Sequence, residues 1–386
     1  FTRRCEKTPV FMTRETARIS DIMLHNSVNV MTRHREELGL PDYPLFTHRG
    51  ADLCRKNWVL VRPGFPFDPL ADTPANNAGS VRMEFSRAGH ILGSAGVRIE
   101  AEGRSLFYTG DLHTEDQTIM RAAEFPENGI DILVMECTRG DAPQPPEYTR
   151  AAECDRLAEL IRTAFHEETS VTIPVFALGK TQELLAILWT LRLEGKIPVC
   201  PVYIGGLSTK ITEIYDEFCE AEGRSLPGLS LLQNIAPYVV SGRDIDSLRP
   251  RKRCIYALSS GMMTPHTLSN LFVRRLVEDD RQHVAFVGYS DPESPAGLLR
   301  RAADGASVVL EPGNPALQKR CKVHEFNFSA HAPRESLLEY AVRVRPSTIL
   351  LVHGDPPAIG WFQARLSERL PECRILVPRP GEILDI

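Results

Sequence analysis

The sequence predicts an α/β fold with more than one domain. Its 386 residues are about two to three domains' worth of chain. Short β-rich segments alternate with helical patterns almost from end to end, which is typical of helices that cover a parallel or mixed sheet. The composition, 42% hydrophobic and 25% charged, is that of an ordinary globular protein. A chain of this length can bury large cores without disulfides or a structural metal.

The first part of the chain contains short strands bounded by turn residues. A strand-like run at 9–12 is followed by predicted strands at 81–85, 105–108 and 131–135, each near Gly, Asn or Asp. The segment 141–146 (DAPQPP) is the best linker candidate, because proline cannot continue a helix or a central strand there.

From residue 150 onward the alternation becomes regular. Helices are predicted at 151–166, 181–193, 209–220 and 265–277, and strands at 171–176, 202–204, 254–258 and 283–289. The tail repeats the pattern, with helices at 334–342 and 358–370 and strands at 348–352 and 374–377. Units of this length indicate parallel strands joined by helical crossovers.

Charge, cysteine usage and hydropathy narrow the class of protein. No apolar run approaches the roughly 18–20 residues of a membrane span, so we expect no membrane protein. The nine cysteines occur singly, which indicates buried thiols in a reducing cytoplasm. The formal net charge is -5, yet residues 249–322 hold 12 Lys+Arg against 7 Asp+Glu. The basic run at 249–253 is either a solvated surface or a wall that faces a polyanion.

Candidate catalytic residues stand in tight turns or just beyond predicted strands. His90, Asp111 and His353 each adjoin a glycine, in GHILGS, YTGDL and LVHGD. Imidazole and carboxylate groups at such positions suit a hydrolytic zinc site. Taken singly, each has a simpler explanation: a turn residue for the histidines, and a helix cap or Asx turn for Asp111. Glu136 could be a strand-terminal charge, and His331 in FSAHA could cap the helix that starts near residue 333.

Taken together and in this order, the segments resemble the β-CASP branch of the metallo-β-lactamase fold. The series is GHILGSA, YTGDL, a strand ending in Glu136, FALGKTQE, SSGM, FSAHA and LVHGD, and it runs from about residue 8 to the end. This branch contains RNase J-type ribonucleases and the endonuclease of the pre-mRNA cleavage and polyadenylation complex. The resemblance implies a metallo-β-lactamase αββα sandwich, formed by residues 1–145 and 326–386. An α/β β-CASP cap, residues 146–325, is inserted into it.

The resemblance also implies a zinc-dependent ribonuclease with two Zn²⁺ ions per intact active site. In this family the residue matching His90 ligates one zinc, the one matching Asp111 bridges both, and the one matching His353 ligates the second. The three β-CASP motif residues fall on Glu136, His331 and His353. A histidine at the third of these positions favours RNA over DNA.

The expected chemistry gives each catalytic residue a role. Two zinc ions would lower the pKa of bound water and hold both sides of an in-line displacement. His331 is the expected general acid for the departing 3′ oxygen, and Glu136 would orient it. Together with Asp111 they form the predicted catalytic set.

The predicted substrate contacts lie in the inserted part of the chain. Lys180 and the Ser259-Ser260-Gly261 segment are candidate phosphate contacts, although simple helix-capping turns would explain both equally well. Ser329 of the FSAHA segment completes the set. Tyr289 is a candidate for stacking a base.

The family's other zinc ligands lie in an HxHxDH motif, which occurs nowhere in the 386 residues. The chain opens Phe-Thr-Arg-Arg without Met and soon reaches a strand, so we expect a fragment whose preceding segment carries the motif. A non-catalytic scaffold subunit is one alternative, and a DNA nuclease of the same fold is another. We expect single-stranded RNA as the partner. Endonuclease or 5′ exonuclease activity and the formation of a homodimer stay open.

Overall fold

The chain folds into two compact units. The computed structural model describes residues 8–71 and 80–385. Unit 1 contains the chain up to Asp116, then 121–144 and 331 onward, whereas unit 2 contains 117–120 and 145–330. The chain therefore leaves unit 1, forms unit 2 and returns to complete unit 1. Residues 1–7, on which the expectation about the start of the chain rests, lie outside the described residues.

Unit 1 is built on a six-stranded mixed sheet with the strand order β16-β15-β6-β5-β4-β3. Its strands are β3 (Arg82–Arg87), β4 (Ala95–Ala101), β5 (Arg104–Tyr108), β6 (Ile132–Glu136), β15 (Thr348–Val352) and β16 (Arg374–Leu376). Strands β5, β6, β15 and β16 run parallel, and β4 is antiparallel to both of its neighbours. Strands β3 and β5 consequently point the same way.

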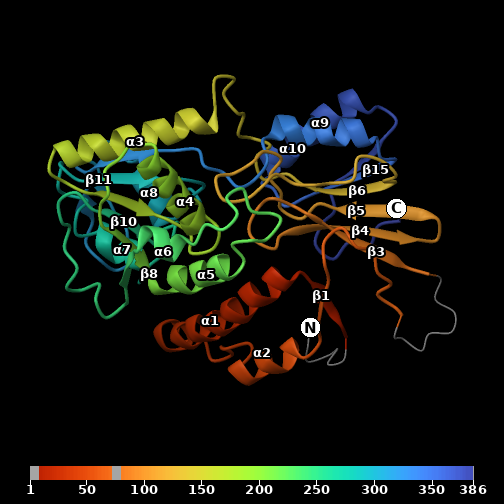
Figure 1. The fold of residues 1–386 in the computed structure, drawn as a ribbon, viewed down its shortest axis with the longest axis horizontal. Helices are drawn as coiled ribbons and strands as arrows, with labels where there is room; N and C mark the ends of the chain where they lie inside the picture. Colours follow the sequence, from red (N-terminus) through yellow and green to blue (C-terminus); the bar gives the residue numbers. More distant parts are fainter. Residues whose placement is uncertain (1–7, 72–79, 386) are drawn as a thin grey trace. The chain divides into compact units, whose positions relative to one another are not determined.

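Helices α9 (Arg334–Val344) and α10 (Pro356–Arg369) pack on one face of this sheet (Figure 1). Alternate strand residues such as Phe107, Leu133 and Leu351 point into this layer and are fully buried. Phe362 of α10 is buried against them. At roughly 1.5–3 kcal/mol for each large apolar side chain removed from water, this layer is a main source of the stability of unit 1.

The remaining elements of unit 1 precede the sheet in sequence. They are β1 (Val10–Met12), α1 (Arg14–Leu38), α2 (His48–Arg55) and β2 (Trp58–Leu60). Strands β1 and β2 pair in parallel as a two-stranded sheet. Thr13 caps α1 by accepting the N–H of Thr16, and Gly39 ends the helix in the left-handed conformation. The described residues thus form one six-stranded sheet and one two-stranded sheet of the predicted sandwich.

Unit 2 is a parallel six-stranded sheet with helices and a small antiparallel pair around it. The sheet order is β14-β11-β7-β10-β8-β9. The strands are β7 (Val171–Pro174), β8 (Val202–Gly205), β9 (Tyr238–Val240), β10 (Ile255–Leu258), β11 (His283–Phe286) and β14 (Lys322–Glu325). The helices are α3 (Arg150–His166), α4 (Lys180–Leu193), α5 (Gly206–Glu217), α6 (Leu231–Ile235), α7 (Leu268–Val273) and α8 (Pro295–Arg301). Strands β12 (Ser307–Val308) and β13 (Leu317–Gln318) form the pair.

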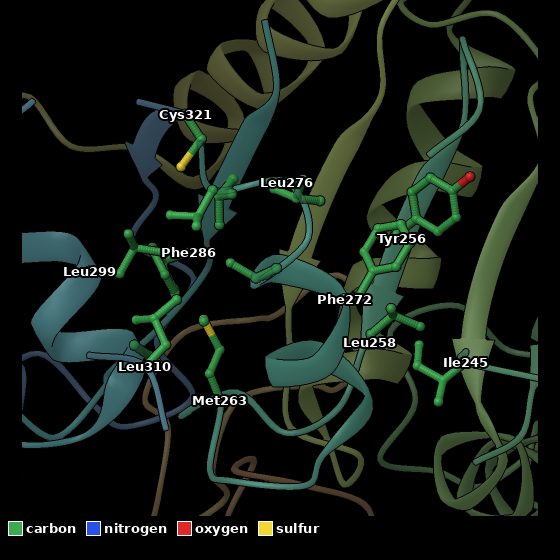
Figure 2. Packing of buried hydrophobic residues seen from close by; sticks show 14 of the residues in the cluster. Ile245, Tyr256, Leu258, Met263, Phe272, Leu276, Phe286, Leu299, Leu310 and Cys321 are labelled. Carbon is green, nitrogen blue, oxygen red and sulfur yellow. The ribbon is translucent and has the colours of Figure 1, made fainter. Parts of the chain in front are cut away.

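The central strands of unit 2 are buried on both faces, as expected for a parallel sheet covered by helices. On one face, the ring of Tyr256 of β10 packs against that of Phe272 of α7 in a tilted arrangement, with ring centroids 4.5 Å apart. Phe286, Leu299 and Met263 complete the same cluster (Figure 2). Because these strands are predominantly apolar runs between helices, the alternation of elements after residue 150 was visible in the sequence.

Several elements differ from their predicted bounds for local reasons. Strand β4 (AGVRIEA) was not predicted, because its own residues have low β-propensity and it exists through pairing with β3 and β5. The helix predicted at 265–277 is reduced to Leu268–Val273, since Met263 and His266 before it have left-handed backbone angles. No helix within residues 8–71 and 80–385 combines the length and apolarity needed to cross a bilayer.

Candidate active site

The candidate active site lies at one edge of the unit 1 sheet, where several strands end. Strands β5, β6 and β15 are adjacent and parallel, so their carboxyl ends meet at the same edge. Asp111 lies three residues after β5, Glu136 is the last residue of β6, and His353 follows β15. Strand β3 points the same way and leads to His90. The sheet topology therefore gathers four of the predicted residues.

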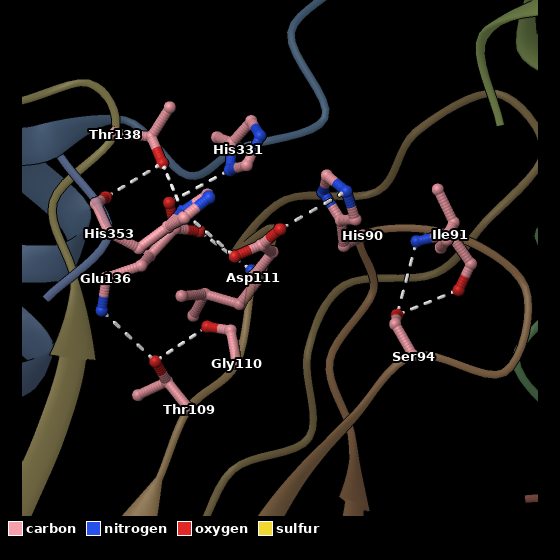
Figure 3. A network of polar contacts seen from close by, with 11 residues as sticks. His90, Ile91, Ser94, Thr109, Gly110, Asp111, Glu136, Thr138, His331 and His353 are labelled. Atoms are coloured by element: carbon pink, nitrogen blue, oxygen red, sulfur yellow. Dashed lines mark hydrogen bonds and ion pairs between the residues drawn. The ribbon is translucent and has the colours of Figure 1, made fainter. Parts of the chain in front are cut away.

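Asp111 stands between the two histidines predicted to be metal ligands. Its Oδ1 lies 3.1 Å from Nδ1 of His353, and its Oδ2 lies 4.0 Å from Nε2 of His90 (Figure 3). The Asp111 side chain is 37% exposed and that of His353 is 55% exposed, whereas His90 is 17% exposed. A carboxylate with an imidazole on each side, open to solvent, is an arrangement that can receive a cation.

His331 pairs with Glu136 beside this group. Nδ1 of His331 lies 2.9 Å from Oε2 of Glu136. The other carboxylate oxygen accepts the backbone N–H of Leu112 at 2.8 Å, and the N–H of Ala332 donates to the Leu112 carbonyl. The rings of His331 and His90 have centroids 4.5 Å apart. These contacts fix the orientation of the His331 ring.

The electrostatics of the pair follow from its burial. Glu136 is 2% exposed, and burial alone would raise the pKa of its carboxyl. The hydrogen bond and the charge of His331, with smaller help from Thr138 and Leu112, outweigh burial and lower that pKa. Glu136 is therefore ionised at neutral pH. The pKa of Tyr108 is raised by burial and by the charges of Asp111 and Glu136, which is consistent with a negative potential at this edge.

Cys137 directly follows Glu136 but has a different environment. It is fully buried, and burial together with the Glu136 charge raises the pKa of its thiol to about 12. The thiol therefore stays protonated and is suited neither to attack nor to metal binding.

Thr138 interacts with both His353 and Glu136, and it was not among the site residues predicted from the sequence. Its Oγ1 lies 3.0 Å from Nδ1 of His353 and donates to the His353 carbonyl at 3.3 Å. It also contributes to lowering the pKa of Glu136. The only feature of the sequence that could have indicated this role is its position two residues after Glu136, at the end of a strand. Threonine is common at such positions, so the indication is weak.

Two glycines permit the close approach that these contacts need. A Cβ on Gly354 would lie 2.8 Å from Cβ of Cys137, so only glycine lets β15 end against β6 in this way. Gly89, with φ +69, precedes His90, and a Cβ there would lie 2.7 Å from the backbone of residues 121 and 123. Steric contact thus explains why glycine, and no larger residue, stands beside each of these two histidines.

The side chains gathered at this edge supply part of the ligands that a metal site needs. Asp111, Glu136, His331 and His353 each offer a ligand atom, and these atoms lie within 4.8 Å of one another. Both oxygens of Glu136 already accept hydrogen bonds, so we assign Glu136 and His331 to a pair beside the cation rather than to its ligands. Asp111, His353 and His90 offer the oxygen and nitrogen donors that zinc prefers. Two tetrahedral zinc ions need more ligands than these three residues supply.

The predicted substrate contacts lie in unit 2, at the carboxyl edge of its parallel sheet. Ser259, Ser260 and Gly261 follow β10, and Lys180 opens α4 beyond β7. The ammonium of Lys180 donates to the carbonyl of Phe328, next to Ser329 in the segment beyond β14. The structure thus brings these five residues to one edge of unit 2.

The basic run lies elsewhere in unit 2. Residues 249–253 precede β10, at the amino edge of the same parallel strands. Lys252 and Arg253 both pair with Glu168. The run is therefore separated from the other substrate candidates by the length of the strands. Tyr289, beyond β11, is 59% exposed, as a base-stacking ring requires.

Comparison with known proteins adds two family matches. The Beta-Casp domain family matches residues 181–299, and the family described as the Zn-dependent metallo-hydrolase RNA specificity domain matches residues 317–378. The first match lies within unit 2. The second contains both His331 and His353.

Several curated proteins are similar over most of this chain. Endoribonuclease YSH1 of Candida glabrata is 26% identical over 93% of this chain and 46% of its own length. Endoribonuclease ysh1 of Aspergillus fumigatus is 30% identical over 77% of this chain and 38% of its own length. The RNase J-like protein of Methanocaldococcus jannaschii is 28% identical, over 80% and 71% respectively. The chain spans about half the length of the YSH1 relatives or less.

The resemblance predicted from the motifs is confirmed by these matches. The chain contains a Beta-Casp domain followed by the Zn-dependent metallo-hydrolase RNA specificity domain, in agreement with the predicted resemblance. The predicted fold class, a mixed α/β protein of this group, is confirmed as well.

Proposed function

We propose that this protein is a zinc-dependent ribonuclease that hydrolyses phosphodiester bonds of single-stranded RNA. The observation that carries the proposal is the meeting of Asp111, His90 and His353 beside the His331–Glu136 pair at one sheet edge. The YSH1 relatives, named endoribonucleases, and the RNA specificity family favour RNA as the substrate.

The proposed metal site has two Zn²⁺ ions. His90 would bind one, Asp111 would bridge both, and His353 would bind the second. Zinc, when bound, would supply charge neutralisation at the phosphoryl oxygens and an activated water. These three residues do not complete the ligand sets of two tetrahedral ions, so further ligands such as those of an HxHxDH motif would be needed. The partly exposed Asp111 carboxylate, which lies between the imidazoles of His90 and His353, supports cation binding there.

The proposed proton donor is His331. Its Nδ1 faces Glu136, which fixes the ring, so its Nε2 is the nitrogen assigned to the leaving 3′ oxygen. Glu136 itself is 2% exposed and does not reach substrate, so it acts as a positioning residue.

The five substrate candidates in unit 2 complete the proposal. Lys180 would contribute a point charge, and the Ser259-Ser260-Gly261 segment and Ser329 would offer hydroxyl and backbone N–H donors to phosphate oxygens. We also propose a cytoplasmic location, since the cysteines of the described residues are all free thiols.

The test compares two substitutions in the full-length protein. His331→Ala should keep its zinc, measured by atomic emission after dialysis, and its RNA affinity. Its cleavage rate should fall by roughly 10² to 10⁴, which is the usual contribution of a positioned acid or base. Asp111→Ala should lose zinc and activity together.

A substrate with a better leaving group separates the two roles further. It should restore cleavage by His331→Ala, because a leaving oxygen of low pKa departs without a proton, and it should not restore Asp111→Ala. Loss of zinc from His331→Ala would contradict the general-acid role. A full-length protein that binds no zinc and cleaves no RNA would instead support the non-catalytic scaffold.

A further inference from the structure

Two adjoining clefts lie at the amino edge of the parallel sheet in unit 2. One, of about 200 Å³, lies between the residues that precede β7, β10 and β11. The other, of about 430 Å³, lies between the end of α3 and the residues that precede β8 and β10. Lys252 lines both, so the clefts are continuous around its side chain. We call this region the amino-edge surface.

The amino-edge surface carries an excess of positive charge. Its lining contains five cationic side chains: Arg162, Arg251, Lys252, Arg253 and Arg281. Against these stand two carboxylates in the lining, Glu167 and Glu168, and two beside it, Glu159 and Asp279, which pair with Arg162 and Arg281. Lys322 pairs with Glu167, so six cations face four carboxylates and the net charge is +2. The whole chain has a net charge of -5, so this excess is local. It would attract an acidic partner.

Not all of this charge is available to a ligand. Lys252 lies 3.4 Å from Glu168, and Arg253 pairs with the same carboxylate. The Arg251 guanidinium, in contrast, has no carboxylate within 4.0 Å among the residues that the structure describes. The side chain of Lys252 is 71% exposed, so its ammonium can turn to a new partner at little cost.

The larger cleft also has an apolar wall. Residues 198–201 (PVCP) form a short loop in which prolines stand on both sides of Val199. Val199 is 86% exposed, an unusual degree for a valine, and it lines the cleft with Pro198 and Pro201. The two prolines restrict the loop backbone, so Val199 can be buried by a partner without a large loss of conformational entropy.

These features fit a peptide better than RNA. The lining contains two aromatic rings: Phe165 is 5% exposed and offers no face on which a base can stack, and the imidazole of His166 is the single exposed ring. An exposed aliphatic side chain has no complement on an RNA backbone, whereas it matches the apolar residues of a protein segment.

We propose that the amino-edge surface is a docking site for an acidic protein segment whose Asp and Glu residues alternate with apolar side chains. The carboxylates contact Arg251 and Lys252, and an apolar side chain covers Val199. The surface lies at the edge of the unit 2 sheet opposite to the proposed phosphate contacts. Docking there therefore does not use the residues assigned to the substrate.

The test measures binding of defined probes by fluorescence anisotropy. The probe is a fluorescein-labelled peptide of twelve residues in which Asp or Glu alternates with Leu or Phe. One comparison peptide has Lys at the acidic positions, and another has Ser at the apolar positions. We expect the acidic and apolar probe to bind with a Kd on the order of 10–100 μM, as for a small transient interface, and we expect neither comparison peptide to bind. The affinity of the probe should fall as salt rises.

Paired variants locate the binding on this surface. Lys252→Glu should weaken peptide binding at least tenfold, and Val199→Asp should weaken it at least fivefold. Arg320→Glu and Val309→Asp, at exposed positions of unit 2 outside the clefts, serve as matched controls and should leave it unchanged. Circular dichroism and thermal unfolding check that all four variants fold.

Three results would overturn the proposal. The first is no binding of the acidic peptide up to 1 mM, and the second is equal binding by the Val199→Asp variant. The third concerns a labelled twelve-nucleotide single-stranded RNA. If Lys252→Glu weakens binding of that RNA and leaves peptide binding intact, the surface faces nucleic acid. Because none of these assays measures cleavage, failure here leaves the proposed ribonuclease function unaffected.

Discussion

Replacing Glu183 by Gln should strongly destabilise unit 2, although Glu183 is outside the proposed active site. Glu183 lies on α4 and is fully buried, and its Oε1 contacts the guanidinium of Arg150. Its two oxygens also accept the backbone N–H groups of Thr118 and Ile119, each at 2.9 Å. One carboxylate thus holds three donors, including those of the segment 117–120.

The expected loss of stability follows from the interactions of Glu183 that glutamine cannot make. It offers one acceptor oxygen, so its NH₂ group would face a donor, and Arg150, 18% exposed, would lose its counter-charge. Removing one partner of a buried ion pair costs about 3–5 kcal/mol. Because Arg150 keeps some contact with water, we expect about 3 kcal/mol. For a unit of about 190 residues, this lowers the melting temperature by roughly 6–12 °C.

The assay is urea unfolding followed by the fluorescence of Trp189, on the same helix, in a Trp58→Phe/Trp361→Phe background. Glu159→Gln serves as the control, since the Glu159–Arg162 pair on α3 is exposed and its removal should cost less than about 0.5 kcal/mol. The hydrogen-exchange rate of the backbone amides of residues 117–120 should rise in Glu183→Gln and stay unchanged in Glu159→Gln. Equal stability of the two variants would refute the reasoning.

The pH dependence provides an independent check. Burial raises the pKa of Glu183, but the charge and the hydrogen bonds of Arg150 and Thr118 lower it more, so the folded-state pKa lies below the ordinary value of 4.5. The unfolded state then binds the proton more tightly than the folded state does. The stabilisation by Glu183 is therefore complete above pH 4.5 and declines as pH falls below it. The difference in stability between wild type and Glu183→Gln should shrink in the same range.

Two further predictions concern the proposed catalytic pair and a buried histidine pair. In the full-length protein, Glu136→Gln should keep its zinc and lose roughly 10²-fold in cleavage rate, because glutamine replaces the charge-assisted hydrogen bond that orients the His331 ring with a weaker neutral one. Retained zinc with an unchanged cleavage rate would contradict the positioning role. In unit 2, burial and then the charges of His283, Lys322 and Arg156 lower the pKa of His324 to about 4. The unfolded state therefore binds more protons between about pH 6.5 and 4, and wild type should lose about 1–2 kcal/mol of stability over that range after allowance for partial exposure. His324→Asn should flatten the loss seen in urea unfolding, and an equal loss in both proteins would rule His324 out as its source.

The site residues could be predicted from the sequence because their neighbours are unusual. His90 and His353 adjoin glycines that only steric contact explains, and Glu136 ends an apolar strand where a charge is otherwise unfavourable. Their gathering at one edge required the strand order, which local patterns do not contain. The alternation of elements was visible because parallel strands buried on both faces are predominantly apolar.

Other features depend on contacts between distant parts of the chain and left no local signal. Thr138 is an ordinary residue type beyond a strand, and its role exists only once His353 lies beside it. The Glu183 contacts join α4 to residues more than sixty positions earlier. The basic run at 249–253 was recognisable as charge, but its position at the amino edge follows from the direction of β10 within the sheet.

The insertion of unit 2 also decides when the catalytic pair can form. Glu136 and His331 are 195 residues apart in the chain, with almost all of unit 2 between them. Closing an unstructured loop of that length costs about 5 kcal/mol from the logarithmic term alone. A single charge-assisted hydrogen bond contributes about 1.5–3 kcal/mol, which does not offset that cost. The pair therefore depends on other contacts of unit 1 that bring the ends of the insertion together, above all the pairing of β15 with β6 and the hydrogen bond from Ala332 to Leu112. Substitutions that weaken these contacts should consequently disrupt the His331–Glu136 contact without touching either residue.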